Sequence, residues 1–176
     1  MDLINNIDNN ILEFIRLNMN NKFFDIIMPF ISSLGNAGFV WIVITIAFLM
    51  QRKYRECGIM LLISLVMCLL IGNLTLKPYV ARLRPSDINT AIHLLIERPT
   101  DFSFPSGHTM SSFAAATVIF NSNKKLGFSA FLLASLIAFS RLYLYVHYPS
   151  DVAAAIILGV LISLCTMKIY NRRKEK

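Results

Sequence analysis

Long apolar segments separated by short polar ones dominate this chain. Apolar runs long enough to cross a membrane lie at residues 36–50, 57–76, 106–121, 127–145 and 150–167. A transmembrane helix needs about 20 predominantly apolar residues, and a helix satisfies its own backbone hydrogen bonds in lipid. The pattern therefore predicts an all-α protein, a polytopic transmembrane helical bundle with five clear spans.

Residues 1–34 follow a different pattern, because polar residues interrupt the apolar ones. Four isoleucines and a phenylalanine between residues 4 and 15 recur at near-helical spacing among Asn and Asp residues. This spacing is typical of an amphipathic helix at a membrane interface. The next stretch, FFDIIMPFISSLG, offers an alternative, a short sixth crossing, although the Asp and the Pro within it count against that.

Composition agrees with a single membrane domain. Of the 176 residues, 56% are hydrophobic and only 15% are charged, and the mean hydropathy is +0.59. This is too apolar for an ordinary soluble domain of this size. Because the spans use most of the chain, residues 1–176 are expected to form one domain in the lipid bilayer, with 1–34 as an interfacial segment. The three cysteines lie at or inside apolar runs and are interpreted as core residues.

The net charge of +7 raises the question of a nucleic-acid partner. The positive residues, however, lie in short loops, in the tail or inside the motifs below, so no nucleic-acid partner is expected. Basic residues at 52–55, 124–125 and 172–176 share one side of the membrane if five spans alternate. The positive-inside rule assigns that side to the cytoplasm. We therefore expect a multi-pass protein of the cell membrane, with a cytoplasmic C-terminus and an extracytoplasmic loop at 77–105.

Several cations on the outer side violate this charge trend: Lys77, Arg82, Arg84, Arg98 and Arg141. Charges near the membrane edge are costly unless they meet an anion or water. Phosphate is a suitable anion, since Arg binds its oxygens in a bidentate fashion and Lys acts as a point charge. For any one of these residues alone, a lipid-headgroup patch is the alternative.

The segment FPSGHTM has the features of a helix start. Pro105 suits the first helical position, and the backbone amides that follow are free to bind an anion. Ser106 can donate its hydroxyl hydrogen, and Gly107 permits close approach of a phosphate. Taken alone, the string is explained equally well by a plain helix start.

Two histidines and an aspartate supply groups for catalysis. His147 and Asp151 are four residues apart, which places them on one face if a helix begins near residue 148. The carboxylate can then hold one ring nitrogen and leave the other free to attack phosphorus. His108, on a different helix, can protonate the leaving oxygen. A zinc site built from the same three residues is the main alternative. The surrounding cations disfavour it, so neither metal nor cofactor is expected.

Together the three clusters resemble the signature of the type 2 phosphatidic acid phosphatase superfamily. That signature is Lys, six residues, Arg-Pro; then Pro-Ser-Gly-His; then Ser-Arg, five residues, His, three residues, Asp. All positions match, within residues 77–151 and in the family's order: Lys77, Arg84, Pro85, Pro105, Ser106, Gly107, His108, Ser140, Arg141, His147 and Asp151.

The resemblance implies a helical bundle and a metal-independent phosphohistidine mechanism. In it, His147 is the nucleophile, Asp151 supports it and His108 is the general acid. The phosphoryl oxygens would be held by Lys77, Arg84, Ser106, Gly107 and Arg141.

The resemblance also implies a lipid phosphate as substrate. Small bacterial members of the membrane branch act on undecaprenyl diphosphate, phosphatidylglycerophosphate or phosphatidic acid. The outward catalytic face favours undecaprenyl diphosphate, whose recycling to undecaprenyl phosphate serves cell-wall synthesis. A protein that only binds or transports a phosphate lipid is the non-enzymatic alternative, but binding alone requires the cations and not two histidines with an orienting acid.

Overall fold

Helices account for nearly all of the regular structure, and residues 2–174, which the structure describes, contain no strand. In this computed structural model the elements, in chain order, are α1 (Asp2–Asn18), α2 (Lys22–Leu34), η1 (Asn36–Gly38), α3 (Phe39–Met50), α4 (Arg55–Cys68), η2 (Leu69–Leu76), α5 (Lys77–Val80), α6 (Pro85–Ile88), α7 (Gly107–Ser122), α8 (Lys124–Tyr143) and α9 (Pro149–Lys174). The predicted all-α bundle is confirmed.

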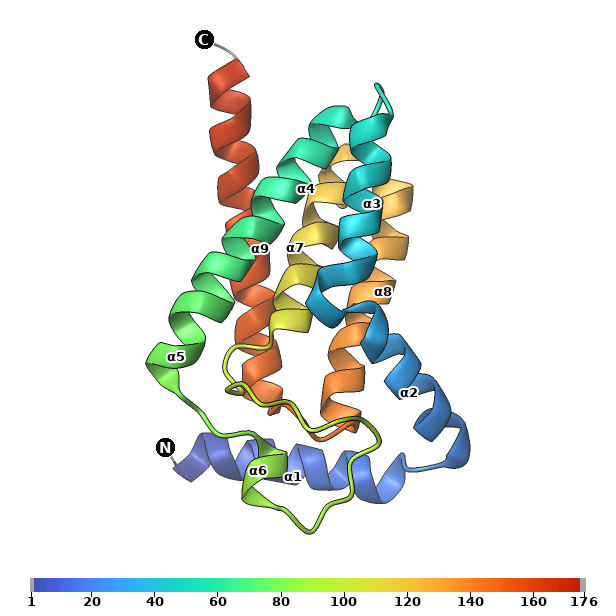
Figure 1. The fold of residues 1–176 in the computed structure, drawn as a ribbon, viewed down its shortest axis with the longest axis vertical. Coiled ribbons are helices and arrows are strands. Elements are labelled where there is room, and N and C mark those ends of the chain that lie inside the picture. Colours follow the sequence, from blue (N-terminus) through green and yellow to red (C-terminus); the bar gives the residue numbers. More distant parts are fainter. Residues whose placement is uncertain (1, 175–176) are drawn as a thin grey trace.

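Helix α7 lies inside the bundle and packs against α3, α4, α8 and α9 (Figure 1). Its middle carries Ala114, Ala115 and Ala116, all fully buried. Small residues allow membrane helices to approach closely. On α9, a Cβ placed at Gly159 would lie 2.4 Å from the backbone oxygen of Met110 on α7. Helix α7, which begins at the Pro-Ser-Gly-His motif, is therefore closely packed against its neighbours.

All five stretches predicted as spans are helical, but they differ in length. Among the described residues, three helical segments are long and apolar enough to cross a membrane: Arg55–Ile88, Lys124–Tyr143 and Pro149–Arg173. Helix α2 and the η1–α3 segment meet at a 47° bend and make a fourth if they are counted as one span. The stretch considered as a sixth crossing is thus α2, which continues through Pro29. At 16 residues, α7 is shorter than a typical span, since each residue adds about 1.5 Å.

Helix α1 lies crosswise under one end of the bundle, where it contacts α8 and α9 (Figure 1). Asp8, Leu12 and Ile15 face the protein and are buried, whereas Ile7 and Phe14 are at least half exposed. The predicted amphipathic helix is therefore observed. The loop between α6 and α7 lies at this same end, and the C-terminus lies at the opposite one (Figure 1).

Candidate active site

The three motif fragments meet at the end of the bundle that α1 crosses. Lys77 begins α5, Arg84 precedes α6, and His108 lies in the first turn of α7. The last turn of α8 brings Arg141, and the connection to α9 brings His147. These five side chains and Gly107 line one polar pocket of about 480 Å³. The convergence expected from the sequence is observed for these six residues.

The predicted nucleophile and its supporting acid are both buried. His147 Nδ1 lies 3.6 Å from Asp151 Oδ2, which is close but beyond hydrogen-bond distance. The same carboxylate oxygen accepts hydrogen bonds from the Tyr148 amide (2.9 Å) and from the Ser103 hydroxyl. Asp151 is thus held behind the histidine and does not line the pocket.

The electrostatic environment keeps His147 uncharged. Burial lowers the pKa of His147 to about 3; the charges of Arg84 and Arg141 act in the same direction, and Asp151 opposes them. At neutral pH the imidazole is therefore unprotonated, which is the form a nucleophile requires. Its Nε2 lies 3.1 Å from Arg84 Nη1, one of the cations predicted to bind phosphate.

Lys77 and Arg84 converge on one carboxylate, that of Asp101 in the loop before α7. Lys77 Nζ pairs with Asp101 Oδ2, and Arg84 Nη2 donates to Asp101 Oδ1 at 2.6 Å. Burial raises the pKa of Asp101, but hydrogen bonds and charges from the two cations outweigh it and bring the pKa to about 2. The side chain of Asp101 is nevertheless 53% exposed. Two cations that share an exposed carboxylate in this way are also arranged to share a phosphate.

Arg141 and His108 are held by the N-terminal segment. Arg141 is buried, donates from Nη1 to Ser32 Oγ at the end of α2, and leaves Nε without a partner. His108 Nε2 donates to Asn36 Oδ1 at 2.9 Å. Ser32 lies in the stretch that the sequence left as a possible sixth crossing, and Asn36 begins the first predicted span, so each of these two stretches supplies one direct contact to the site.

Ser106 and Gly107 shape the start of α7. Ser106 is the N-cap: its Oγ accepts from the Thr109 amide at 3.4 Å and bonds with the Thr109 hydroxyl at 2.9 Å. It is fully buried and does not line the pocket, so its phosphate contact stays a prediction. A Cβ at Gly107 would lie 2.8 Å from Asn73 Oδ1, so glycine fits best in this tight space.

Comparison with known proteins identifies the family. Residues 56–175 match the PAP2 superfamily. The chain belongs to this superfamily. It is 36% identical over 146 residues to an undecaprenyl-diphosphatase of Sulfolobus acidocaldarius, which covers 82% of this chain and 70% of that protein. It is 29% identical over 150 residues to the undecaprenyl-diphosphatase BcrC of Bacillus subtilis, which covers 83% and 75%.

The fold is also that of a solved PAP2 protein. A transmembrane PAP2-type phosphatidylglycerolphosphate phosphatase from Bacillus subtilis superposes with a TM-score of 0.80 at 25% sequence identity. The match covers 98% of this chain and 88% of that one. Family, fold and apolar helices together support a phosphatase hydrolase located in a membrane.

An apolar groove adjoins the polar pocket of this PAP2 protein. Its volume is about 570 Å³, and it runs between α3 and α4. Its walls include Ile42, Ile46, Leu49, Leu62, Leu65 and Val66. Groove and pocket share Lys77, Asp101, Gly107 and His108. A long apolar chain in the groove would thus end at the cations.

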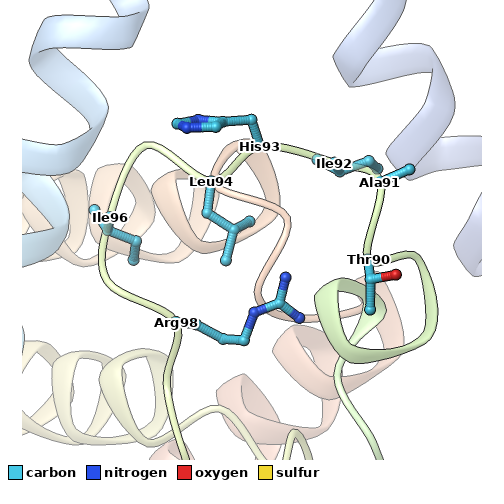
Figure 2. A pocket seen from close by; sticks show the side chains of 7 residues that line it. All are labelled: Thr90, Ala91, Ile92, His93, Leu94, Ile96 and Arg98. Atoms are coloured by element: carbon cyan, nitrogen blue, oxygen red, sulfur yellow. The ribbon is translucent and has the colours of Figure 1, made fainter.

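The loop between α6 and α7 forms the outer rim. It curls around a further hollow of about 340 Å³, into which the Leu94 and Arg98 side chains point (Figure 2). Arg98 donates to the Ser86 carbonyl and pairs with Asp87 at 3.3 Å, and it also lines the polar pocket. His93 lies on this loop and outside the polar pocket.

Sequence reasoning missed several residues that contact the motif side chains, among them Ser103, which donates to Asp151. Ser32, Asn36 and Asp101 belong to no motif, and only the proximity of Asp101 to the Pro-Ser-Gly-His segment could have singled it out. Arg82 was noted only as an outward cation. It donates to Asp151 Oδ1 at 2.7 Å, and its unusual charge two residues before Arg84 was the available signal.

Within residues 2–174, no three His, Cys, Asp or Glu side chains gather as metal ligands do. The pocket instead collects the positive charges of Lys77, Arg84 and Arg141. Its residues are therefore suited to holding an anion directly.

Proposed function

We propose that this protein is a lipid phosphatase that removes the terminal phosphate of undecaprenyl diphosphate to give undecaprenyl phosphate. The observation that carries the proposal is the shared wall between the cationic pocket and the apolar groove. The diphosphate would lie among Lys77, Arg84 and Arg141, and the isoprenoid chain would run between α3 and α4. Two relatives named undecaprenyl-diphosphatase support this choice of lipid.

The proposed chemistry proceeds through a phosphohistidine and requires no metal. His147 Nε2 forms a bond to the terminal phosphorus, and the bond from that phosphorus to the bridging oxygen breaks. The bridging oxygen leaves with a proton from His108. Water then attacks the phosphohistidine, the P–N bond breaks, and phosphate is released while His108 regains a proton.

The remaining residues stabilise this reaction. Asp151 orients the Nδ1–H of His147 and balances the positive charge that develops on the ring. Lys77, Arg84 and Arg141 face the charge that is redistributed over the phosphoryl oxygens in the transition state. Gly107 leaves room for the phosphate at the start of α7.

A second candidate is phosphatidylglycerophosphate, with phosphatidic acid as a further diacyl alternative. The observation in its favour is the TM-score of 0.80 against a phosphatidylglycerolphosphate phosphatase. The groove would then hold acyl chains in place of the isoprenoid chain. The reaction and the residues would be the same.

The test is phosphate release by the purified protein in detergent with a chelator present. Undecaprenyl diphosphate, phosphatidylglycerophosphate and phosphatidic acid are compared at equal concentration, and the highest kcat/KM is expected for the first. Release from none of them, or release only after metal is added, would overturn the proposal. A higher kcat/KM for phosphatidylglycerophosphate would favour the second candidate.

One variant separates an enzyme from a lipid-binding protein. His147→Ala should abolish turnover and retain measurable lipid binding, whereas His93→Ala, on the outer loop, should keep both. Wild type that is denatured in alkali during turnover should carry a phosphate label that is alkali-stable and lost in acid, and His147→Ala should not. Turnover by His147→Ala at the wild-type rate would contradict the assigned nucleophile.

A further inference from the structure

Helix α1 carries a buried carboxylate that the motif chemistry does not use. Asp8 is 1% exposed, although the other polar side chains of α1 from Asn5 to Asn18 are exposed. A buried carboxylate is costly unless charges and hydrogen-bond donors surround it. The burial of Asp8 therefore calls for specific partners.

Those partners belong to the first turn of α9 and to Arg82. Asp8 Oδ1 accepts from the Ser150 amide at 2.9 Å, and Oδ2 accepts from the Ser150 hydroxyl at 2.5 Å. Oδ2 also accepts from Arg82 Nη2 at 2.8 Å. Because Ser150 is the second residue of α9, Asp8 caps that helix from outside it. Helix α1 is thereby fixed one residue away from Asp151.

Arg82 connects Asp8 with the catalytic carboxylate. Its Nη1 donates to Asp151 Oδ1 at 2.7 Å and to Ser150 Oγ at 2.7 Å. The ring of Tyr148 stacks on the guanidinium, with Cζ 4.0 Å from the ring centroid. The carboxylates of Asp8 and Asp151 therefore both bind the Arg82 guanidinium, and the Tyr148 ring restricts its rotation.

This arrangement divides the two oxygens of Asp151. Oδ1 is held by Arg82. Oδ2 accepts from the Tyr148 amide and the Ser103 hydroxyl, and it is the oxygen that faces His147 Nδ1, at 3.6 Å. The charge of Arg82 is shared between Asp8 and Asp151. If Asp8 were neutral, the whole attraction of Arg82 would act on Asp151 and weaken its hold on the histidine.

We propose that Asp8 and Arg82 are positioning residues that aim Asp151 at His147 and set how strongly it supports the nucleophile. This inference rests on the proposed function and makes α1 part of the active site. Asp8 and Arg82, which lie outside the motifs, would then help to set the rate of phosphoryl transfer.

The decisive variant is Asp8→Asn, which removes the charge and keeps an oxygen that can accept from the Ser150 amide. We expect kcat to fall by about 10-fold, because a misdirected Asp151 stabilises the charge that develops on His147 less well, with KM changed less than about twofold because the substrate contacts remain. The acid limb of the kcat profile should shift to lower pH, since a weakened Asp151 makes His147 less basic. Glu13→Gln removes a charge from the exposed face of the same helix and should change none of these values.

Two further variants separate positioning from folding. Asp8→Glu keeps the charge and should recover part of kcat. Arg82→Lys keeps the charge but loses the fork that reaches both carboxylates, and it should lower kcat with little change in KM. If Asp8→Asn and Arg82→Lys lower the unfolding temperature but keep the wild-type kcat and pH profile, the positioning role is overturned.

The outcomes distinguish this inference from the proposed function. Wild-type protein that releases phosphate from no lipid overturns the proposed function, and the inference with it. Active wild type with an unchanged kcat in Asp8→Asn overturns only the inference.

Discussion

Asp101 is the residue whose charge we expect to compete with a bound phosphate. Its carboxylate holds Lys77 and Arg84, the two cations that the motif assigns to phosphoryl oxygens. A phosphate that binds both cations must displace it. The negative charge of Asp101 thus offsets the repulsion between the two cations, and under the proposed function it should weaken anion binding.

Replacing Asp101 by Asn should therefore strengthen product inhibition. We expect the inhibition constant for inorganic phosphate to fall by about 5- to 10-fold, on the order of one typical hydrogen bond in net free energy. Glu97→Gln is the matched control, because Glu97 lines the same pocket and its replacement removes the same charge. An inhibition constant that rises in Asp101→Asn would show that the carboxylate holds the cations in place and does not compete.

The lowered pKa of His147 predicts how stability depends on pH. An unfolded histidine takes up a proton near pH 6.5, whereas folded His147 does so only at about pH 3. Between these values the unfolded state binds more protons, so the free energy of unfolding falls as pH falls. This loss amounts to roughly 2 kcal/mol at pH 5.

The measurement is the unfolding temperature in detergent between pH 7 and pH 5. Wild type should lose stability across this window, and His147→Gln should lose clearly less because the titrating group is gone. His93→Gln removes an exposed loop histidine and should follow wild type. Equal slopes in all three proteins would contradict the assignment.

The residues of the site differ in how well the sequence predicts them. Lys77, Arg84 and His147 were predictable because a charge or an imidazole at the outer end of an apolar span needs a partner. Asp101 and Asn36 were not, because single polar residues in loops are ordinary and only tertiary packing brings them to the pocket. Arg82 lies between these cases: its charge was noted, but its partner Asp8 lies 74 residues away.

At the level of elements, the apolar pattern predicted the helices better than the bends and irregular turns between them. The spans are helical where expected, since runs of apolar residues determine both burial and helix length. The bend at Gly35 and the π-helical turn η2 before Lys77 were not predicted. Both depend on how neighbouring helices pack, and neither changes the hydrophobic period.

The contact between α7 and α9 positions two residues of the proposed catalytic site. These helices carry His108 and Asp151, and Gly159 allows them to approach. Gly159→Val should force the two backbones apart, at a cost of about 1–3 kcal/mol, and should lower both the unfolding temperature and kcat. Ala153→Val places the same side chain on the exposed face of α9 and should change neither. A stable, fully active Gly159→Val would show that the pair of helices can separate without disturbing the site.

At the scale of the whole molecule, the basic loops and the polar pocket lie at opposite ends of the bundle. The basic loop at 51–54, the start of α8 and the C-terminal end of α9 lie together, and the polar pocket lies at the end crossed by α1 (Figure 1). The positive-inside rule then orients the pocket away from the cytoplasm. This orientation is a prediction that suits a substrate regenerated on the outer side of the membrane.

A pair of single-cysteine variants tests this orientation. Thr90 lies on the loop between α6 and α7, Gln51 lies at the opposite end of the bundle, and both are exposed. In a background where Cys165, the exposed native cysteine, is replaced by Ser, Thr90→Cys should react with a membrane-impermeant thiol reagent on intact cells. Gln51→Cys should react only after lysis, since its loop would face the cytoplasm. The reverse pattern would place the pocket in the cytoplasm, where the substrate would have to be a lipid phosphate made on the inner leaflet.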